Sequence, residues 1–216
     1  ECDLLDSSYG LENLTKSALE NLAQTANLHI EFLESFEQLV FGIIPAAYDD
    51  GYSVWAGDRP DYFGDLRVRQ AIAACLQPAA LANAVLSEKL PAELLPQWQD
   101  WTAGLDAEAL LDQAGWIDAD GDPTTPRVAQ GINGVFDMTP LSLSLLTSQA
   151  ELDQQIGTWI VTRLGECGVE IHWQSLPIAE LYAPGPEGVL FGRQFDLALL
   201  SWHTAGQDPC RMYLSK

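Results

Sequence analysis

The stretch LSLSLLTSQAELDQQIGTWIVTRLGECGVEIHWQSL, residues 141–176, decides the fold of this chain. Residues 141–147 alternate apolar and polar side chains as a strand does, and residues 169–176 predict a second strand. Between the two strands, Ser148 and Glu151 form a predicted capping box that opens a helix. The inward face of this helix would carry Leu152, Ile156, Ile160 and Leu164. Strand, helix and strand in succession predict parallel strands joined by a right-handed crossover.

The residues that follow add a third strand to the same sheet. A short helix is predicted near 178–183, and FDLALLSWHTAGQDP, residues 195–209, begins with an apolar strand over 195–202. Ligands of open α/β sheets bind beyond the carboxyl ends of the strands. The predicted strand ends are Thr147-Ser148, Leu176-Pro177 and Trp202-His203. We therefore expect a cleft at this edge, with Trp202 facing it.

The preceding residues predict helices and two more strands. Helices are expected at 11–24, 65–76, 78–87 and 106–114, and two paired strands at 28–33 and 37–44. Asp65 and Asp106 are placed to cap two of the helices. Pro78 suits a first helical turn, and Gly115 suits a helix end. The fold class that follows is α/β, with a mixed sheet of βαβ units flanked by helices.

The composition is that of a globular protein with a strong acidic balance. The chain has 216 residues, of which 47% are hydrophobic and 19% charged, and 10 basic against 31 acidic residues give a net charge of −21. This charge argues against nucleic acid as a partner, because binding a phosphate backbone needs a basic surface. It argues equally against docking on anionic membranes. No run of about 18 apolar residues predicts a membrane-spanning helix.

No motif predicts a metal, a cofactor or a catalytic centre. The DxDGD run at 118–122 has the start of a calcium loop, but Pro123 stands where that loop needs Gly and Ala129 where it needs Glu. The three histidines are far apart in the sequence, and no nucleophile, base and orienting group fall into a recognisable set. We expect no metal, no cofactor and no enzymatic activity. An α/β hydrolase is the less favoured alternative.

The four cysteines leave two readings open. Cys2, Cys75, Cys167 and Cys210 are scattered, with no CxxC pair, which disfavours zinc and thioredoxin-type sites. Four thiols allow three complete pairings, and the sequence does not choose among them. One disulfide and buried free thiols are both compatible with this pattern.

Four segments carry motifs that occur together in one protein family. They are LVFGII (39–44), DLRVRQAIAACLQPAALANAVL (65–86), ALLDQAGWIDADGDP (109–123) and FDLALLSWHTAGQDP (195–209). The second has a V-R-Q-A-I run before a helix break, the third an A-G-W before an acidic turn, and the fourth a strand-end Trp before a D-P turn. In this order they resemble family 5 of the extracellular solute-binding proteins, the peptide, dipeptide and nickel receptors of ABC importers.

The resemblance implies a receptor with two lobes that trap a small solute, peptide-like or an oligosaccharide, for ABC permease subunits. Residues 1–216 would form a single ligand-binding lobe of the type II periplasmic-binding-protein fold, excised from a chain whose first lobe is missing here. The receptor would be extracellular or periplasmic and tethered to the membrane. The ligand-binding residues would be Trp202, His203, Thr204, Ala205 and Gln207.

The chain departs from the family's pattern at the predicted site. Where peptide-binding members place an Asp that holds the ligand's amino terminus, this chain has Ala205, and Gly42 replaces a common Asn. Because alanine cannot supply the charge, the identity of the ligand does not carry over. A degenerate lobe that serves only as an interaction or scaffold domain is the alternative that these departures favour.

Overall fold

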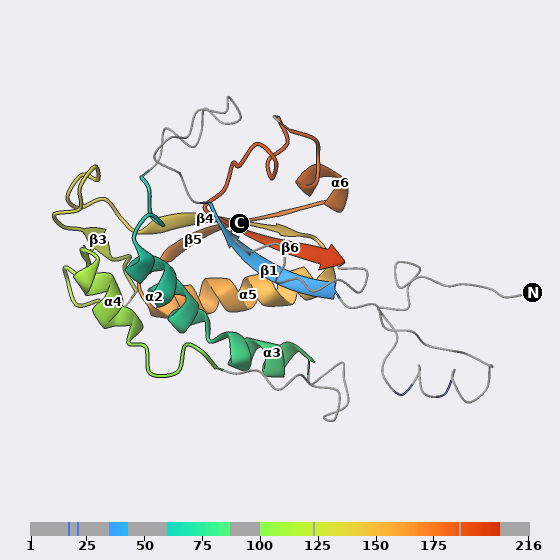
Figure 1. The fold of residues 1–216 in the computed structure, drawn as a ribbon, viewed down its shortest axis with the longest axis horizontal. Helices are drawn as coiled ribbons and strands as arrows, with labels where there is room; N and C mark the ends of the chain where they lie inside the picture. Colours follow the sequence, from blue (N-terminus) through green and yellow to red (C-terminus); the bar gives the residue numbers. More distant parts are fainter. Residues whose placement is uncertain are drawn as a thin grey trace, which may run out of the picture.

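The computed structural model describes residues 35–42, 60–86, 100–122, 124–185 and 187–203, together with residues 17 and 21. The two single residues are helical and fall within the helix predicted at 11–24. The strand predicted at 28–33, and with it the predicted pairing to 37–44, lies outside the described residues. The described part is an α/β fold built on a mixed sheet, as predicted (Figure 1).

Four strands form the central sheet in the order β1-β6-β4-β5. Strand β4 (Ser142–Ser148) pairs in parallel with β5 (Glu170–Leu176) on one side and with β6 (Leu197–His203) on the other. Strand β1 (Ser35–Phe41) runs antiparallel along β6. The three strands predicted after residue 140 are therefore confirmed, and so is their parallel direction. The crossover from β4 to β5 passes through the predicted helix.

Each face of the sheet packs on its own apolar core, because successive side chains of a strand point to opposite faces. On one face, Leu143, Leu145 and Leu197 join the core that contains residues of the long crossover helix. On the other face, Leu146 and Ala198 pack in a smaller core. The helices α2, α3 and α5 lie on the first side of the sheet and α6 on the second (Figure 1).

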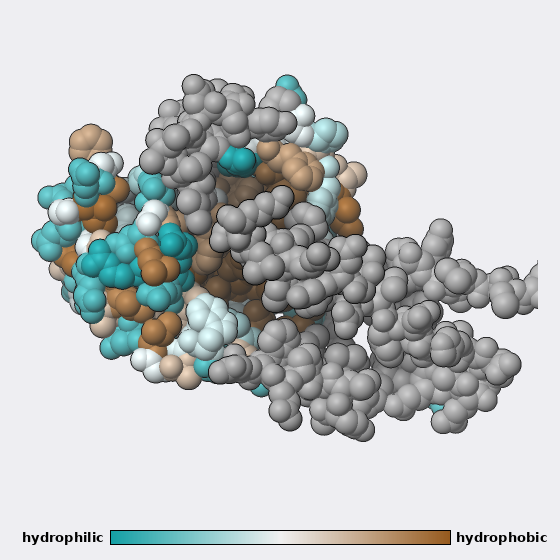
Figure 2. All heavy atoms as spheres, viewed as in Figure 1, coloured by the Kyte–Doolittle hydropathy of each residue, from teal (hydrophilic) through white to brown (hydrophobic). Residues whose placement is uncertain are grey.

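The helices begin close to their predicted caps. They are α2 (Leu66–Leu76), α3 (Pro78–Leu86), α4 (Ala107–Gln113), α5 (Glu151–Glu166) and α6 (Ile178–Leu181). The Asp65 carboxylate accepts the Arg67 N–H at 2.8 Å, and the Asp106 carboxylate accepts the Ala109 N–H at 3.0 Å. Both predicted N-caps are confirmed. Seen from the side of Figure 1, hydrophilic residues cover much of α2 and α4, as expected of helices with one face in water (Figure 2).

The capping box predicted for α5 is wrong. Ser148 is the last residue of β4, where it pairs with Leu176, so it cannot also take the N-cap position. Its Oγ accepts the N–H of Ala150 at 3.0 Å, and Ala150 is the N-cap residue, without a side-chain cap bond. Pairing within the sheet extends β4 by one residue and delays the start of the helix.

A buried arginine and a disulfide connect the remaining elements. The strands β2 (Trp116–Ile117) and β3 (Val128–Ala129) form a small hairpin. Beside it, the Arg127 side chain donates to the carbonyls of Trp116 at 2.9 Å and Cys167 at 3.2 Å. Cys75 and Cys167, 92 residues apart in the sequence, form a disulfide, which decides between the two readings of these cysteines. Cys2 and Cys210 lie outside the described residues.

Candidate functional site

The carboxyl ends of β4, β5 and β6 meet at one edge of the sheet, where the sequence predicts the ligand cleft. Strand β4 ends at Ser148, β5 at Leu176 and β6 at His203. The N-terminus of α5 lies at the same edge, because α5 follows β4 after a short turn. Strand β1 begins here as well, with Ser35 opposite His203. Segments from distant parts of the chain therefore converge on this edge.

Hydrogen bonds fix the polar groups at the ends of β4 and β5. The side-chain amide of Gln154 donates to the Ser148 carbonyl at 2.8 Å and to Ser175 Oγ. Ser175 Oγ donates to the same carbonyl at 3.1 Å. The indole N–H of Trp173 donates to Thr147 Oγ1 at 2.9 Å. These bonds hold the N-terminal turn of α5 on the strand ends, so the base of the predicted cleft is built from paired polar groups.

The predicted ligand-binding residues lie at and after the end of β6. The backbones of Trp202 and His203 pair with the first residues of β1, which places both residues at the carboxyl edge. Their side chains fall outside the described part of the structure, as do Thr204, Ala205 and Gln207. Contact between these five residues and a ligand stays a prediction.

One acidic side chain at this edge escaped the sequence analysis. Asp153, in the first turn of α5, is only 5% exposed. Leu152, the first residue of the predicted inward stripe, is half-buried and packs against the core, and Asp153 is the first fully buried residue of the helix. The helical period allows this, because residue 153 shares a face with Ile156 and Ile160. The missed signal was a charged residue at a core position of an otherwise apolar stripe.

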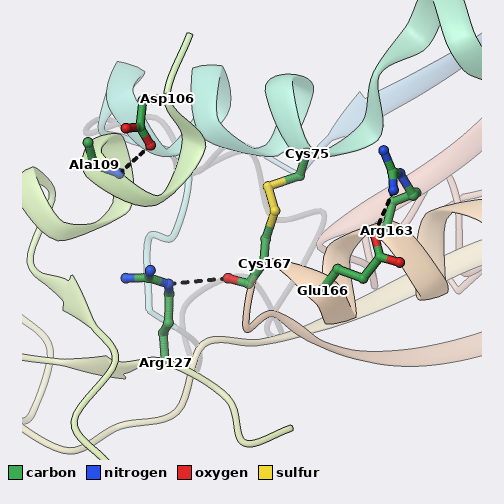
Figure 3. Close-up of a disulfide and its surroundings, with 7 residues drawn as sticks. All are labelled: Cys75, Asp106, Ala109, Arg127, Arg163, Glu166 and Cys167. Atoms are coloured by element: carbon green, nitrogen blue, oxygen red, sulfur yellow. Dashed lines mark hydrogen bonds and ion pairs between the residues drawn. A yellow bond between two sulfur atoms is a disulfide. The ribbon is translucent and has the colours of Figure 1, made fainter. Parts of the chain in front are cut away.

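An open hollow of about 500 Å³ lies beside the disulfide. Figure 3 shows the disulfide and several of the residues around it. It is lined by the C-terminal ends of α2 and α5 and by the N-terminus of α4, so it lies toward the amino ends of the parallel strands. Most of its charged groups have partners in the protein. Asp106 caps α4, and Arg163 pairs with Glu166 at 2.7 Å. The hollow is therefore a weaker candidate for a ligand site than the carboxyl edge.

The acidic turn that resembles a calcium loop is organised by its own hydrogen bonds. The backbone N–H of Asp122 donates to Asp120 at 3.0 Å and holds the pKa of Asp120 below its ordinary value. The Thr124 hydroxyl donates to Asp122 at 2.7 Å and lowers the pKa of Asp122. Among the described residues, no group of three metal-ligating side chains is close enough to hold an ion. The carboxylates of this turn therefore accept hydrogen bonds from neighbouring hydroxyl and backbone N–H groups.

Comparisons with known proteins were made on both sequence and fold. A model of the bacterial extracellular solute-binding proteins, family 5 (middle region), matches residues 13–215. The fold is similar to that of the oligopeptide-binding protein AppA from Bacillus subtilis in complex with a nonapeptide, with a TM-score of 0.55 and 16% identity over 94% of this chain and 39% of that chain. No curated protein matches the sequence.

Two further solved structures are similar. NikA from Brucella suis in complex with Fe(III)-EDTA has a TM-score of 0.53 and 17% identity, over 92% of this chain and 37% of that chain. MelB from Agrobacterium fabrum C58 in complex with stachyose has a TM-score of 0.53 and 16% identity, over 79% of this chain and 26% of that chain. At such identities the similarity concerns the fold alone. The chain spans at most 39% of the length of these three structures.

Proposed function

The chain belongs to the bacterial extracellular solute-binding proteins, family 5, and on that basis we propose that it forms one lobe of a two-lobed receptor that captures a small solute for an ABC importer. The family consists of solute-binding proteins, which are not enzymes, so the hydrolase alternative is set aside. The ligand would lie at the carboxyl edge of the sheet, between this lobe and the other. The receptor would work outside the cytoplasm, tethered to the membrane.

The observation that carries the proposal is the convergence of three parallel strand ends and a helix N-terminus at one edge, in a chain of this family. Open α/β sheets bind their ligands at such an edge. The disulfide supports an extracytoplasmic location, because structural disulfides persist in oxidising compartments. The family is itself described as extracellular.

The mechanism that fits this architecture is hinge closure. A solute would first bind one lobe, the second lobe would close over it, and the permease would recognise the closed form. Trp202 would stack on the solute or wall it in, and the main chain of 203–207 would supply hydrogen bonds. The bonded ends of β4 and β5 would form a rigid base for this contact.

The similar structures are compatible with solutes of different chemical classes. The similar structures hold a nonapeptide, an Fe(III)-EDTA complex and stachyose. Ala205 cannot provide the charge that a simple peptide receptor would place there. We therefore propose a peptide-like solute or an oligosaccharide, and keep a scaffold lobe without a solute as the second candidate.

The test is tryptophan fluorescence of the full-length receptor, titrated with oligopeptides, oligosaccharides and chelated metals. We expect one class to produce a saturable change. Trp202→Ala should weaken that binding by at least about tenfold. Trp101→Ala is the matched control, because Trp101 is 62% exposed and belongs to the loop before α4. No response to any compound would favour the scaffold alternative, and equal effects of both variants would remove Trp202 from the site.

A further inference from the structure

The hollow beside the disulfide lies away from the proposed cleft and has room for a ligand of its own. Helices α2 and α5 reach it with their C-terminal ends, and the start of α4 closes another side. Its volume of about 500 Å³ is that of a site for a small molecule. Cys75 and Cys167 both belong to its wall, so a ligand held there would cover the disulfide.

The wall of the hollow combines hydrogen-bond acceptors with hydrogen-bond donors. The carboxylates of Asp106, Glu108 and Glu166 accept hydrogen bonds, and the guanidinium of Arg163 donates them. The side-chain amide of Gln77 can do both. Because Glu108, Glu166 and Gln77 are exposed, a ligand can reach them. The hollow therefore suits a ligand that both donates and accepts hydrogen bonds.

Arg163 is the member of this wall whose hydrogen bonding is incomplete. Its Nη1 donates to Glu166 Oε2 at 2.7 Å beside the disulfide (Figure 3), and its guanidinium carbon lies 5.5 Å from the centre of the Trp159 ring. Among the described residues, its Nε is the only buried side-chain nitrogen or oxygen without a hydrogen-bond partner. Such a group calls for an explanation. The side chain is 26% exposed, so a rotation of the guanidinium toward the hollow would bring Nε to an acceptor there.

Charge and hydrogen bonding together select the class of ligand. Three carboxylates stand against one guanidinium, and the C-terminal ends of α2 and α5 add partial negative charge, so an anion is disfavoured. A ligand that only donates hydrogen bonds would leave Arg163 Nε without an acceptor. A hydroxyl group accepts and donates and carries no charge. A neutral compound with several hydroxyl groups therefore matches the wall.

We propose that this hollow is a second binding site, for a neutral saccharide or other polyol. One hydroxyl oxygen of the ligand would accept from Arg163, and other hydroxyl groups would donate to Glu108 and Glu166. The site is independent of the cleft in the proposed function, because it lies toward the amino ends of the parallel strands. Binding here does not require a solute in the cleft.

The experiment follows reduction of the disulfide in the full-length receptor, because a ligand in the hollow shields Cys75 and Cys167. Dithiothreitol is applied with increasing lactitol, a neutral polyol, or with lactobionate, which has a carboxylate in place of one hydroxymethyl group. We expect lactitol to slow the reduction by about tenfold at about ten times its dissociation constant. Lactobionate at the same concentrations should leave the rate within about twofold, because the carboxylates repel it.

Three variants locate the protecting ligand. Arg163→Met should raise the lactitol concentration for half protection by at least about tenfold, because a hydrogen bond from a charged donor is lost. Arg67→Met is the matched control, since Arg67 pairs with Asp65 at the other end of α2. It should leave that concentration within about twofold. Trp202→Ala, in the proposed cleft, should also leave it within about twofold.

The opposite results would overturn the proposal. Protection that is lost in Trp202→Ala would place lactitol in the cleft. Protection that survives Arg163→Met would remove Arg163 from the site, and a lower melting temperature of this variant would then assign Arg163 to the fold. Equal protection by lactobionate would contradict selection of a neutral ligand. Absence of protection by lactitol, trehalose and sorbitol would refute the second site and leave the proposed receptor function untouched.

Discussion

At the scale of single residues, Gly157 shows how closely α5 approaches the sheet. A Cβ atom at this position would lie 2.7 Å from Cε2 and 3.1 Å from Cη2 of Trp173. The Trp173 ring cannot turn away freely, since its N–H donates to Thr147 Oγ1. A glycine in a helix interior is usually unfavourable, so this one is retained for the space it leaves.

We therefore predict that Gly157→Ala lowers the free energy of unfolding by about 1–3 kcal/mol through overpacking. Gly165→Ala is the control in the same helix, because a Cβ atom there meets nothing within 4 Å. There the usual gain in helix propensity, about 0.5–1 kcal/mol, should appear. Urea denaturation of both variants measures the difference. Stabilisation of similar size at both positions would show that Trp173 yields to the added methyl group.

The sequence pattern predicted the apolar residues on the buried face of α5, but it did not predict the acidic residue Asp153 on the same face. Ile156, Ile160 and Leu164 are buried as the helical period predicts. The same period places residue 153 on the buried face, but a charged residue is ordinarily assigned to the solvent side. In the structure Leu152 is half-buried against the same core, so the buried face includes one acidic residue beside the predicted apolar stripe.

At the scale of elements, the helix caps were predictable and the strand partners only in part. An N-cap acts within one helical turn, so Asp65 and Asp106 could be identified from adjacent residues. The parallel pairing of β4 and β5 follows from a crossover of ordinary length. The pairing of β1 with β6 joins residues 35–41 to residues 197–203, and no local pattern specifies a partner so distant. The N-cap of α5 was predicted at the wrong residue, because Ser148 pairs with Leu176 in the sheet and is therefore the last residue of β4.

The N-cap of α2 gives a prediction that depends on pH. Asp65 accepts the Arg67 N–H and pairs with the Arg67 guanidinium, and this side-chain bond lowers the pKa of Asp65 below its ordinary 3.8. Asp65→Ala should cost about 1 kcal/mol of stability at pH 7, and Asp65→Asn much less, because asparagine also caps. A lowered pKa means that the charged form is favoured by folding. The contribution of the charge is thus present above pH 4 and is lost as the pH falls through the lowered pKa.

The corresponding measurement follows wild type, Asp65→Ala and Asp65→Asn in urea from pH 7 to about pH 3. The advantage of the wild type over Asp65→Asn should shrink toward the acidic end. An advantage that grows with acidity would contradict the sign of the shift. Asp106→Asn, at the N-cap of α4, provides a comparison in which no arginine of the described residues pairs with the capping acid.

At the scale of the whole molecule, cross-links between α2, α4 and α5 hold the helical layer together. The disulfide joins Cys75 near the end of α2 to Cys167 after α5 (Figure 3). The Trp159 N–H of α5 donates to the Leu76 carbonyl of α2 at 2.8 Å. Arg127 links α4 to the same region through Asp112 and the Cys167 carbonyl. None of these links touches the carboxyl edge, so the layer can be weakened without altering the proposed site.

This separation yields a prediction about the disulfide. A cross-link over 92 residues restricts the unfolded chain, by about 4–5 kcal/mol in the chain-entropy model, and loss of a native disulfide costs about 2–5 kcal/mol. The double variant Cys75→Ser, Cys167→Ser should therefore unfold at lower denaturant concentration by that amount. Solute affinity of the folded receptor should stay within about twofold, because the disulfide and the cleft lie toward opposite ends of the parallel strands.

A dithiol reductant tests the assignment of the cross-link. The wild type should lose stability on reduction and then match the double variant, whereas the double variant should not respond to the reductant. A response of the double variant would place a second stabilising disulfide between Cys2 and Cys210, the cysteines outside the described residues. A double variant as stable as the oxidised wild type would show that Trp159 and Arg127 hold the layer without the disulfide, because both contacts survive the substitution.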